Sequence, residues 1–80
     1  MSDTFQRLRA ILASTGLSRS TIYLRIAQGV FTKPVSLGGR AVGWPTSEVT
    51  ALNAAWIAGK SEAEIRQLVA SLQTARKVAK

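Results

Sequence analysis

The chain is 80 residues long, the size of one small domain whose modest core leaves little room for a buried active site. Its 11 Lys and Arg residues against 4 Asp and Glu give a net charge of +7, which favours a polyanionic partner. Nucleic acid, an anionic membrane surface or plain solubility would each explain this excess. Cys and His are absent, which excludes disulfides, thiolate chemistry and the usual zinc ligands, so we expect no metal and no cofactor.

The positive charge is concentrated in the first half of the chain. Residues 1–40 carry six basic and one acidic side chain, whereas residues 41–80 carry five and three. Arg7 and Arg9 interrupt any apolar signal sequence, and the apolar stretch at 54–58 is far shorter than the ~20 residues of a membrane-spanning helix. We therefore expect a soluble protein without a membrane partner, whose first half faces an anion.

The first predicted elements are two short helices. A helix over about 9–14 ends at Gly16, because glycine accepts the left-handed conformation that commonly follows a helix. Ser18 then caps a second helix, which ends before Gly29. This spacing predicts a helix-turn-helix over about 9–28.

The second helix has two predicted faces. Ile22 and Ile26 would pack against the core, with Tyr23 and Ala27 at the border of that face. The opposite, exposed arc is predicted to contain Ser20, Thr21, Leu24, Arg25 and Gln28. Taken alone, such a pattern also describes many ordinary short helices.

If this helix enters the major groove of double-stranded DNA, its residues divide by the contacts that they make. Ser18 and the free amides of the first turn would meet a phosphate, and Arg19 would contact a phosphate or a base. Ser20 and Thr21 would reach base edges, and Leu24 would touch a thymine methyl group. Contacts to the DNA backbone that position the protein would come from Tyr23 and Arg25.

A β-hairpin is predicted directly after the helix-turn-helix. Strands at 35–37 and 41–44 would pair, and Gly38 and Gly39 supply the positive φ angles of a tight turn. A winged domain places its wing at this position. The thin tip would let Arg40 reach an adjacent minor groove or a phosphate.

Three aromatic residues lie near the hairpin and in the helix after it. Phe31 and Trp44 flank the wing, where base stacking in a single-strand binder is one interpretation. Packing against the helices is the favoured one, because aromatic residues at the base of a hairpin usually join the core. Trp56, at helical spacing from Val49 and Leu52, is also predicted to pack.

Two further helices complete the chain. Thr46 is expected to cap a helix that extends to about residue 58, with Glu48 in its first turn. Ser61 and Glu64 have capping-box spacing and predict a helix over about 62–76.

The last predicted helix carries an apolar stripe, which either folds back to finish the core or forms a dimer contact between two chains. The stripe consists of Ile65, Leu68, Val69 and Leu72. We accordingly divide the chain into a DNA-binding domain at 1–58 and, at 59–80, a helix and basic tail for packing or dimerisation.

Two stretches of the sequence resemble the AlpA family of phage and prophage regulators, which are related to excisionases and more distantly to MerR-type domains. They are TGLSRSTIY at 15–23 and GVFTKPVSLGGRAVGWPTSEV at 29–49, and the resemblance covers roughly residues 5–58. It implies a mainly α fold with a small β-hairpin, namely a winged helix-turn-helix, followed here by a C-terminal helix. Recognition through Ser18 to Arg25 and a wing contact at Gly38 to Arg40 are implied as well.

The resemblance also implies a function and a cellular location. We expect transcriptional regulation of mobile-element genes, action as an excisionase (a recombination directionality factor), or both, in the cytoplasm at the bacterial nucleoid. Partners would be double-stranded DNA, further copies of the chain as a homodimer or an oligomer along DNA, and an integrase. Two positions depart from the family, since Leu24 follows Tyr23 where a basic residue is common and Thr32 replaces a common proline.

Two other classes of function remain to be compared with DNA binding. A protein-interaction module, such as an antirepressor or adaptor, would use the C-terminal stripe. An enzyme is not expected, because each carboxylate is more natural at a terminus or helix start than in a catalytic pair. These carboxylates are Asp3, Glu48, Glu62 and Glu64.

Overall fold

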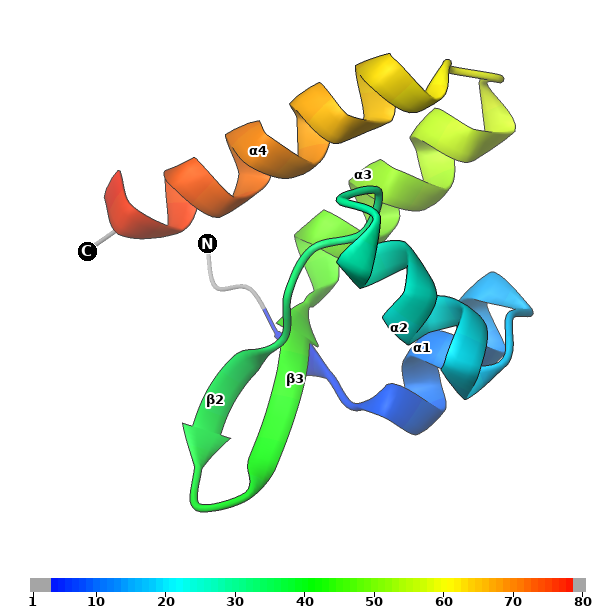
Figure 1. The fold of residues 1–80 in the computed structure, drawn as a ribbon. Coiled ribbons are helices and arrows are strands. Elements are labelled where there is room, and N and C mark those ends of the chain that lie inside the picture. Colours follow the sequence, from blue (N-terminus) through cyan, green and yellow to red (C-terminus); the bar gives the residue numbers. More distant parts are fainter. Residues whose placement is uncertain (1–3, 79–80) are drawn as a thin grey trace.

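The computed structural model describes residues 4–78, with side chains for residues 4–76, and confirms the expected fold class. Within these residues, four helices lie together at one end of a small antiparallel sheet, whose β2–β3 hairpin projects away from them (Figure 1). In chain order the elements are β1 (Phe5–Gln6), α1 (Leu8–Thr15), α2 (Arg19–Ala27), β2 (Val35–Gly38), β3 (Ala41–Pro45), α3 (Thr46–Ile57) and α4 (Glu62–Val78).

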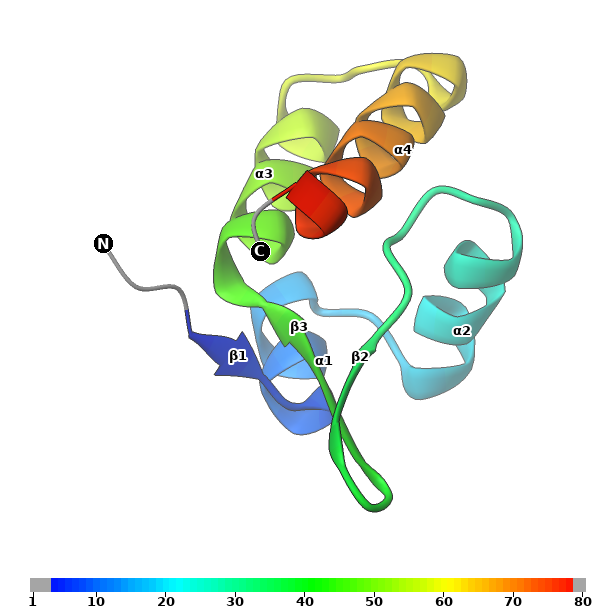
Figure 2. The same ribbon diagram turned by 90° about the vertical axis from the view of Figure 1, so that its left-hand side faces the viewer.

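The predicted hairpin is present and gains a third strand. Val35 pairs with Gly43 and Gly38 with Ala41, and the chain turns at Gly39 and Arg40. Gly38 and Gly39 have φ angles of 107° and 55°, which suit a residue without a Cβ. The sheet order is β1-β3-β2, because Phe5 and Gln6 pair along the outer edge of β3. Figure 2 shows the β2–β3 hairpin, hereafter the wing, extending away from the helices. The two-residue strand β1 was not predicted, since so short a segment has no periodicity to read.

The residues that were predicted to end and begin helices largely do so. After α2, the Gly29 N–H donates to the Ile26 carbonyl and the Val30 N–H to the Arg25 carbonyl, with Gly29 at φ 79°. This is the double hydrogen bond of a Schellman helix end. At α4, the Ser61 N–H donates to Glu64 Oε1 at 2.9 Å and the Glu64 N–H to Ser61 Oγ at 3.2 Å, so the predicted capping box is confirmed.

The predicted capping role of Thr46 is wrong. Thr46 is the first residue of α3, and Pro45 in the cap position makes no side-chain cap. The Thr46 hydroxyl lies 2.7 Å from the Thr4 hydroxyl, and its N–H donates to the Thr4 carbonyl at 2.7 Å. Pairing of β1 with β3 brings Thr4 to this position, so the groups that would cap the helix are used between distant segments instead.

One hydrophobic core joins all four helices and the sheet. Its most deeply buried members include Ile11 from α1, Ile22 from α2, Trp44 from β3, Leu52 from α3 and Ile65 from α4, each 0% exposed. Residues on both sides of the proposed boundary at residue 58 thus share this core. Burial of this apolar surface is the main stabilising contribution that a small chain has available.

The C-terminal helix folds back along α3, which is the first of the two roles considered for its stripe (Figure 1). Ile65 and Val69 are buried within the chain, and Leu68 and Leu72 pack partly buried against the same core. Of the four stripe residues, only Leu68 and Leu72 keep part of their surface exposed. No helix within residues 4–78 is both long and apolar enough to cross a membrane.

Candidate nucleic-acid interface

The N-terminus of α2 carries a cluster of hydroxyl groups. Ser18 caps the helix by accepting the Thr21 N–H at 3.3 Å, as predicted, and its Oγ lies 2.9 Å from Thr21 Oγ1 and 3.3 Å from Ser20 Oγ. Ser18 and Ser20 are exposed, whereas Thr21 is half-buried. The cap occupies the Ser18 hydroxyl, so an anion here would meet the remaining free N–H groups of the first turn, where the helix dipole is positive.

The exposed arc of α2 differs from the predicted one. Tyr23 and Ala27 face solvent, whereas Thr21 and Arg25 are turned half-way into the protein. The arc is rotated because α3 packs on the flank of α2 that carries Arg25, which the sequence pattern of α2 alone does not reveal. We define the exposed arc of α2 as Arg19, Ser20, Tyr23, Leu24 and Ala27.

Arg25 packs on an aromatic ring within the protein. Its guanidinium carbon lies 4.3 Å from the centre of the Trp56 ring in α3, which is a close cation–π arrangement. Together with Thr15, Leu17, Phe31 and Asn53, these two side chains line a cavity of about 200 Å³ between the helices. Arg25 therefore joins α2 to α3. Trp56 packs against the core as predicted, with Arg25 over its ring.

Arg19 keeps its charge at the surface. Its guanidinium carbon lies 5.8 Å from the centre of the Tyr23 ring, one helical turn away, and both side chains are exposed. At this distance the interaction is weak and leaves the guanidinium available to a ligand. The two arginines of α2 thus differ in surroundings, although either residue alone looks equally suited to bind phosphate.

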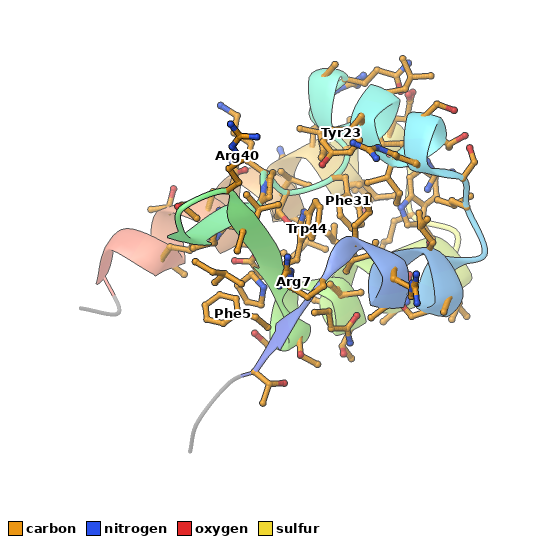
Figure 3. The ribbon with its side chains drawn as sticks, turned by 90° about the horizontal axis from the view of Figure 1, so that it is seen from below. Phe5, Arg7, Tyr23, Phe31, Arg40 and Trp44 are labelled. Carbon is orange, nitrogen blue, oxygen red and sulfur yellow. The ribbon has the colours of Figure 1, made fainter. Side chains whose placement is uncertain are left out.

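The wing and α2 face the same side of the molecule. Figure 3 shows Arg40 projecting from the wing toward the side on which α2 lies, while Phe5 of β1 points to the opposite side. Gly38, Gly39 and Arg40 are all exposed. The structure therefore brings together the two predicted contact elements, with one basic side chain at the thin end of the wing.

None of the carboxylates that the structure describes belongs to α2 or the wing. Within residues 4–76, the carboxylates are Glu48, Glu62 and Glu64, and all belong to α3 or α4. Glu48 pairs with Arg76, Glu62 lies 3.7 Å from Arg66, and Glu64 belongs to the capping box. An approaching polyanion would thus meet basic and neutral groups of α2 and the wing.

Comparison with known proteins places this arrangement in a family. A family model described as prophage CP4-57 regulatory protein (AlpA) matches residues 4–61. The chain belongs to the AlpA family. This is a family of regulatory proteins and not of enzymes.

A phage protein is also similar to the chain. An uncharacterized protein, ORF88, of Enterobacteria phage P4 is 50% identical to it over 58 residues. The aligned part covers 72% of this chain and 66% of the phage protein, just under two thirds of that protein's length. No solved structure matches the chain.

The two departures from the AlpA pattern occupy different environments. Leu24 is 56% exposed on the arc of α2, so a large apolar side chain is presented where a basic one is common. Thr32 is fully buried, and its carbonyl accepts the Trp44 Nε1–H at 2.9 Å. Its own Oγ1 has no hydrogen-bond partner among the described residues. The first departure thus alters the surface, and the second alters the core beneath the wing.

The aromatic residues at the base of the wing pack inside the protein, as predicted. Phe31 and Trp44 are 3% and 0% exposed, and their rings meet edge to face with centres 6.3 Å apart. Figure 3 shows both between the sheet and the helices. They support the wing from inside and are not available for base stacking.

Sequence reasoning missed a set of α4 side chains that bind the segment between α2 and the wing. Arg66 Nε donates to the Gln28 carbonyl at 3.0 Å, Gln73 Oε1 accepts the Lys33 N–H at 2.9 Å, and Arg76 Nη2 donates to the Lys33 carbonyl at 2.7 Å. The available signal was the position of Arg76, four residues after Leu72 on the apolar side of α4. A basic residue there has to find an acceptor.

Proposed function

We propose that this protein is a sequence-specific double-stranded DNA-binding regulator that inserts α2 into a major groove and extends its wing along the adjacent DNA. The observation that carries the proposal is that Arg40 projects from the wing on the side of the molecule where α2 lies (Figure 3). Between them lies a surface whose described side chains include no carboxylate. A recognition helix with a wing beside it is a common way of binding duplex DNA.

The residues of α2 divide into those that position the protein and those that read bases. Ser18, the free amides that follow it, Arg19 and Tyr23 contact phosphates, which fixes the helix on the DNA without selecting a sequence. Ser20 and Leu24, one turn apart on the exposed arc, reach the base edges. The exposed methyl groups of Leu24 favour a thymine methyl group as neighbour.

Two of the predicted contacts take smaller roles in this proposal. Thr21 is half-buried and shares a hydrogen bond with Ser18, so it approaches bases only at the edge of the interface. Arg25 supports α2 from Trp56 and does not contact the DNA backbone directly. At the wing, Gly38 and Gly39 allow a close approach, and Arg40 contacts a phosphate or the minor groove.

The biological role that we propose is control of mobile-element genes or of recombination direction. Membership of the AlpA family of prophage regulators supports a regulatory role. The same contacts would serve a repressor, an activator, or an excisionase that acts beside an integrase, with one copy or several along the DNA.

The decisive experiment is footprinting on the DNA around the protein's own gene, combined with a salt titration. We expect protection of a defined site and a steep fall of affinity with salt, because each neutralised phosphate releases counterions. A single promoter-proximal site would indicate transcriptional control, and a repeat array beside an integrase crossover site would indicate recombination control. The absence of any protected site in low salt would contradict the proposal.

The alternative of a protein-interaction module that uses the C-terminal stripe has little exposed apolar surface to draw on. Ile65 and Val69 are 0% and 4% exposed, because the stripe packs against the core of its own chain. A protein partner that displaced α4 would have to expose this core. We therefore favour DNA binding.

A further inference from the structure

The segment that joins the two proposed DNA contacts has no regular structure of its own. Residues 28–34, hereafter the connector, follow α2 and lead into β2 without forming a helix or a strand. Val30, Phe31 and Thr32 in its middle are buried, which anchors it from inside. Its two ends are exposed at Gln28 and Lys33, so the placement of the wing relative to α2 depends on what holds these ends.

Both ends of the connector are held by α4. Arg66 donates to the Gln28 carbonyl, and a Cβ on the neighbouring Gly29 would meet Arg66 Cγ at 3.9 Å, so the Arg66 stem lies along the connector. At the other end, Gln73 accepts the Lys33 N–H and Arg76 donates to the Lys33 carbonyl. Three side chains of one helix thus satisfy the main chain at the start and the finish of the connector.

Arg76 also joins the segment before β2 to the first turn of the helix that follows β3. The same guanidinium donates to Glu48 through Nε at 2.8 Å and Nη2 at 2.5 Å, and the Glu48 side chain is only 5% exposed. Lys33 precedes β2, and Glu48 lies in the first turn of α3, directly after β3. A planar guanidinium holds such partners in one fixed geometry.

We propose that Arg66, Gln73 and Arg76, hereafter the α4 clamp, are positioning residues that set the wing relative to the recognition helix for DNA binding. This inference rests on the proposed function. The clamp acts from a distance, because α4 lies at the opposite end of the molecule from the wing tip (Figure 1). It also lies outside residues 4–61, the range that the AlpA family model matches.

The first test measures wing position without DNA. Ser20→Cys and Arg40→Cys provide two labelling sites in a chain that has no other Cys, and spin labels there report the distance between α2 and the wing tip. The clamp variant is Gln73→Ala with Arg76→Lys, which keeps a cation beside Glu48 but loses the fork and one hydrogen bond. Gln67→Ala, at an exposed position of α4, is the matched control.

We expect the distance distribution to be about twofold broader in the clamp variant than in the parent or the control, because the connector then samples more conformations. Thermal unfolding is recorded beside it, so that all distances are taken well below the midpoint of each variant. A clamp variant that stays folded and keeps the parental distribution would overturn the proposal.

The second test measures binding with a double-mutant cycle on the unlabelled proteins, using a random-sequence duplex of about 30 base pairs in low salt. Arg40→Ala should raise Kd about fivefold in the parent and less than about twofold in the clamp variant, because a misplaced wing has little contact to lose. An equal rise of Kd on Arg40→Ala in the parent and in the clamp variant would overturn the proposed positioning role. If the parent binds no duplex, the proposed function fails, while the distance measurement still decides whether the clamp positions the wing.

Discussion

The long polar side chains on α2 and the wing differ from those on α4 in the contacts that they make within the protein. On α4, Arg66, Gln73 and Arg76 bond main-chain groups or carboxylates of the same chain. On the other side, Arg40 makes no hydrogen bond or ion pair with any described residue, and Arg19 lies only over the Tyr23 ring of its own helix at 5.8 Å. Basic residues of α4 therefore hold the fold together, whereas Arg19 and Arg40 on α2 and the wing remain available to a ligand.

Within α2 itself the same division separates two arginines six residues apart. Arg25 lies over Trp56 and belongs functionally with the α4 side chains, whereas Arg19 remains exposed. A count of basic residues overstates the charge that is available to a ligand, because several arginines make contacts within the protein. The following substitutions test this division, beginning with the largest expected effect.

The strongest test of the architectural side is Arg76→Ala. Its removal leaves Glu48 buried without a counter-charge, so we expect a loss of about 3 kcal/mol in the free energy of unfolding, measured by urea denaturation. The double variant Arg76→Ala with Glu48→Ala should lose less than the sum of the two single variants. Arg66 pairs with Glu62, which is exposed. If Arg76→Ala lowered the free energy of unfolding no more than Arg66→Ala does, the structural role of the Arg76–Glu48 pair would be contradicted.

The second test compares the two arginines of α2. Arg25→Ala should lower the free energy of unfolding by about 1 to 2 kcal/mol, because it removes a cation–π contact and opens the adjoining cavity. Arg19→Ala should leave unfolding within about 0.5 kcal/mol of the parent and weaken binding to duplex DNA. A loss of stability in Arg19→Ala together with a loss of DNA affinity alone in Arg25→Ala would contradict this division of roles.

The third test separates positioning contacts from reading contacts. Arg40→Ala should weaken binding to all duplexes by about 1 kcal/mol and lower the slope of log K against log salt by about 1. Ser20→Ala should instead change the preference among sequences, because its hydroxyl lies on the exposed arc. Selection from a randomised duplex pool compares the sequence preferences of the two variants. A preference altered by Arg40→Ala alone would contradict the division into positioning and reading contacts.

The smallest effect is expected at the start of α4. Hydrogen bonds with the backbone and hydroxyl of Ser61 lower the pKa of Glu64 from its ordinary value of 4.5. The stabilisation is therefore fully present above pH 4.5 and is lost as the pH falls through the lower pKa of the folded state. Thermal unfolding of Glu64→Gln should show a shallower loss of stability in acid than the parent, and parallel profiles would contradict this.

Features that depend on neighbours in the sequence were predicted well. The helix ends at Gly29 and Ser61 follow from backbone geometry and from hydrogen bonds that span three to five residues. The same holds for the glycine turn that carries Arg40. The contact elements of the candidate interface were therefore visible before the fold was known.

Features that depend on distant segments were missed or misassigned. Thr46 was predicted to cap α3, but β1 places Thr4 against it from 42 residues away. The contact of the Arg25 guanidinium with Trp56 of another helix was not foreseen, and whether Arg25 also contacts DNA stays a prediction. Periodicity describes one helix at a time and carries no information about which neighbour packs on which flank.

The helices, the wing and the excess of positive charge are properties of the sequence alone, because each arises from local geometry or composition, and the motifs at 15–23 and 29–49 carry the resemblance to the AlpA family. The packed fold leaves Arg19 and Arg40 exposed while it engages Arg25, folds the α4 stripe onto the core of its own chain, and brings α4 to both ends of the connector. These outcomes depend on side chains far apart in the chain, whose meeting is a property of the packed fold.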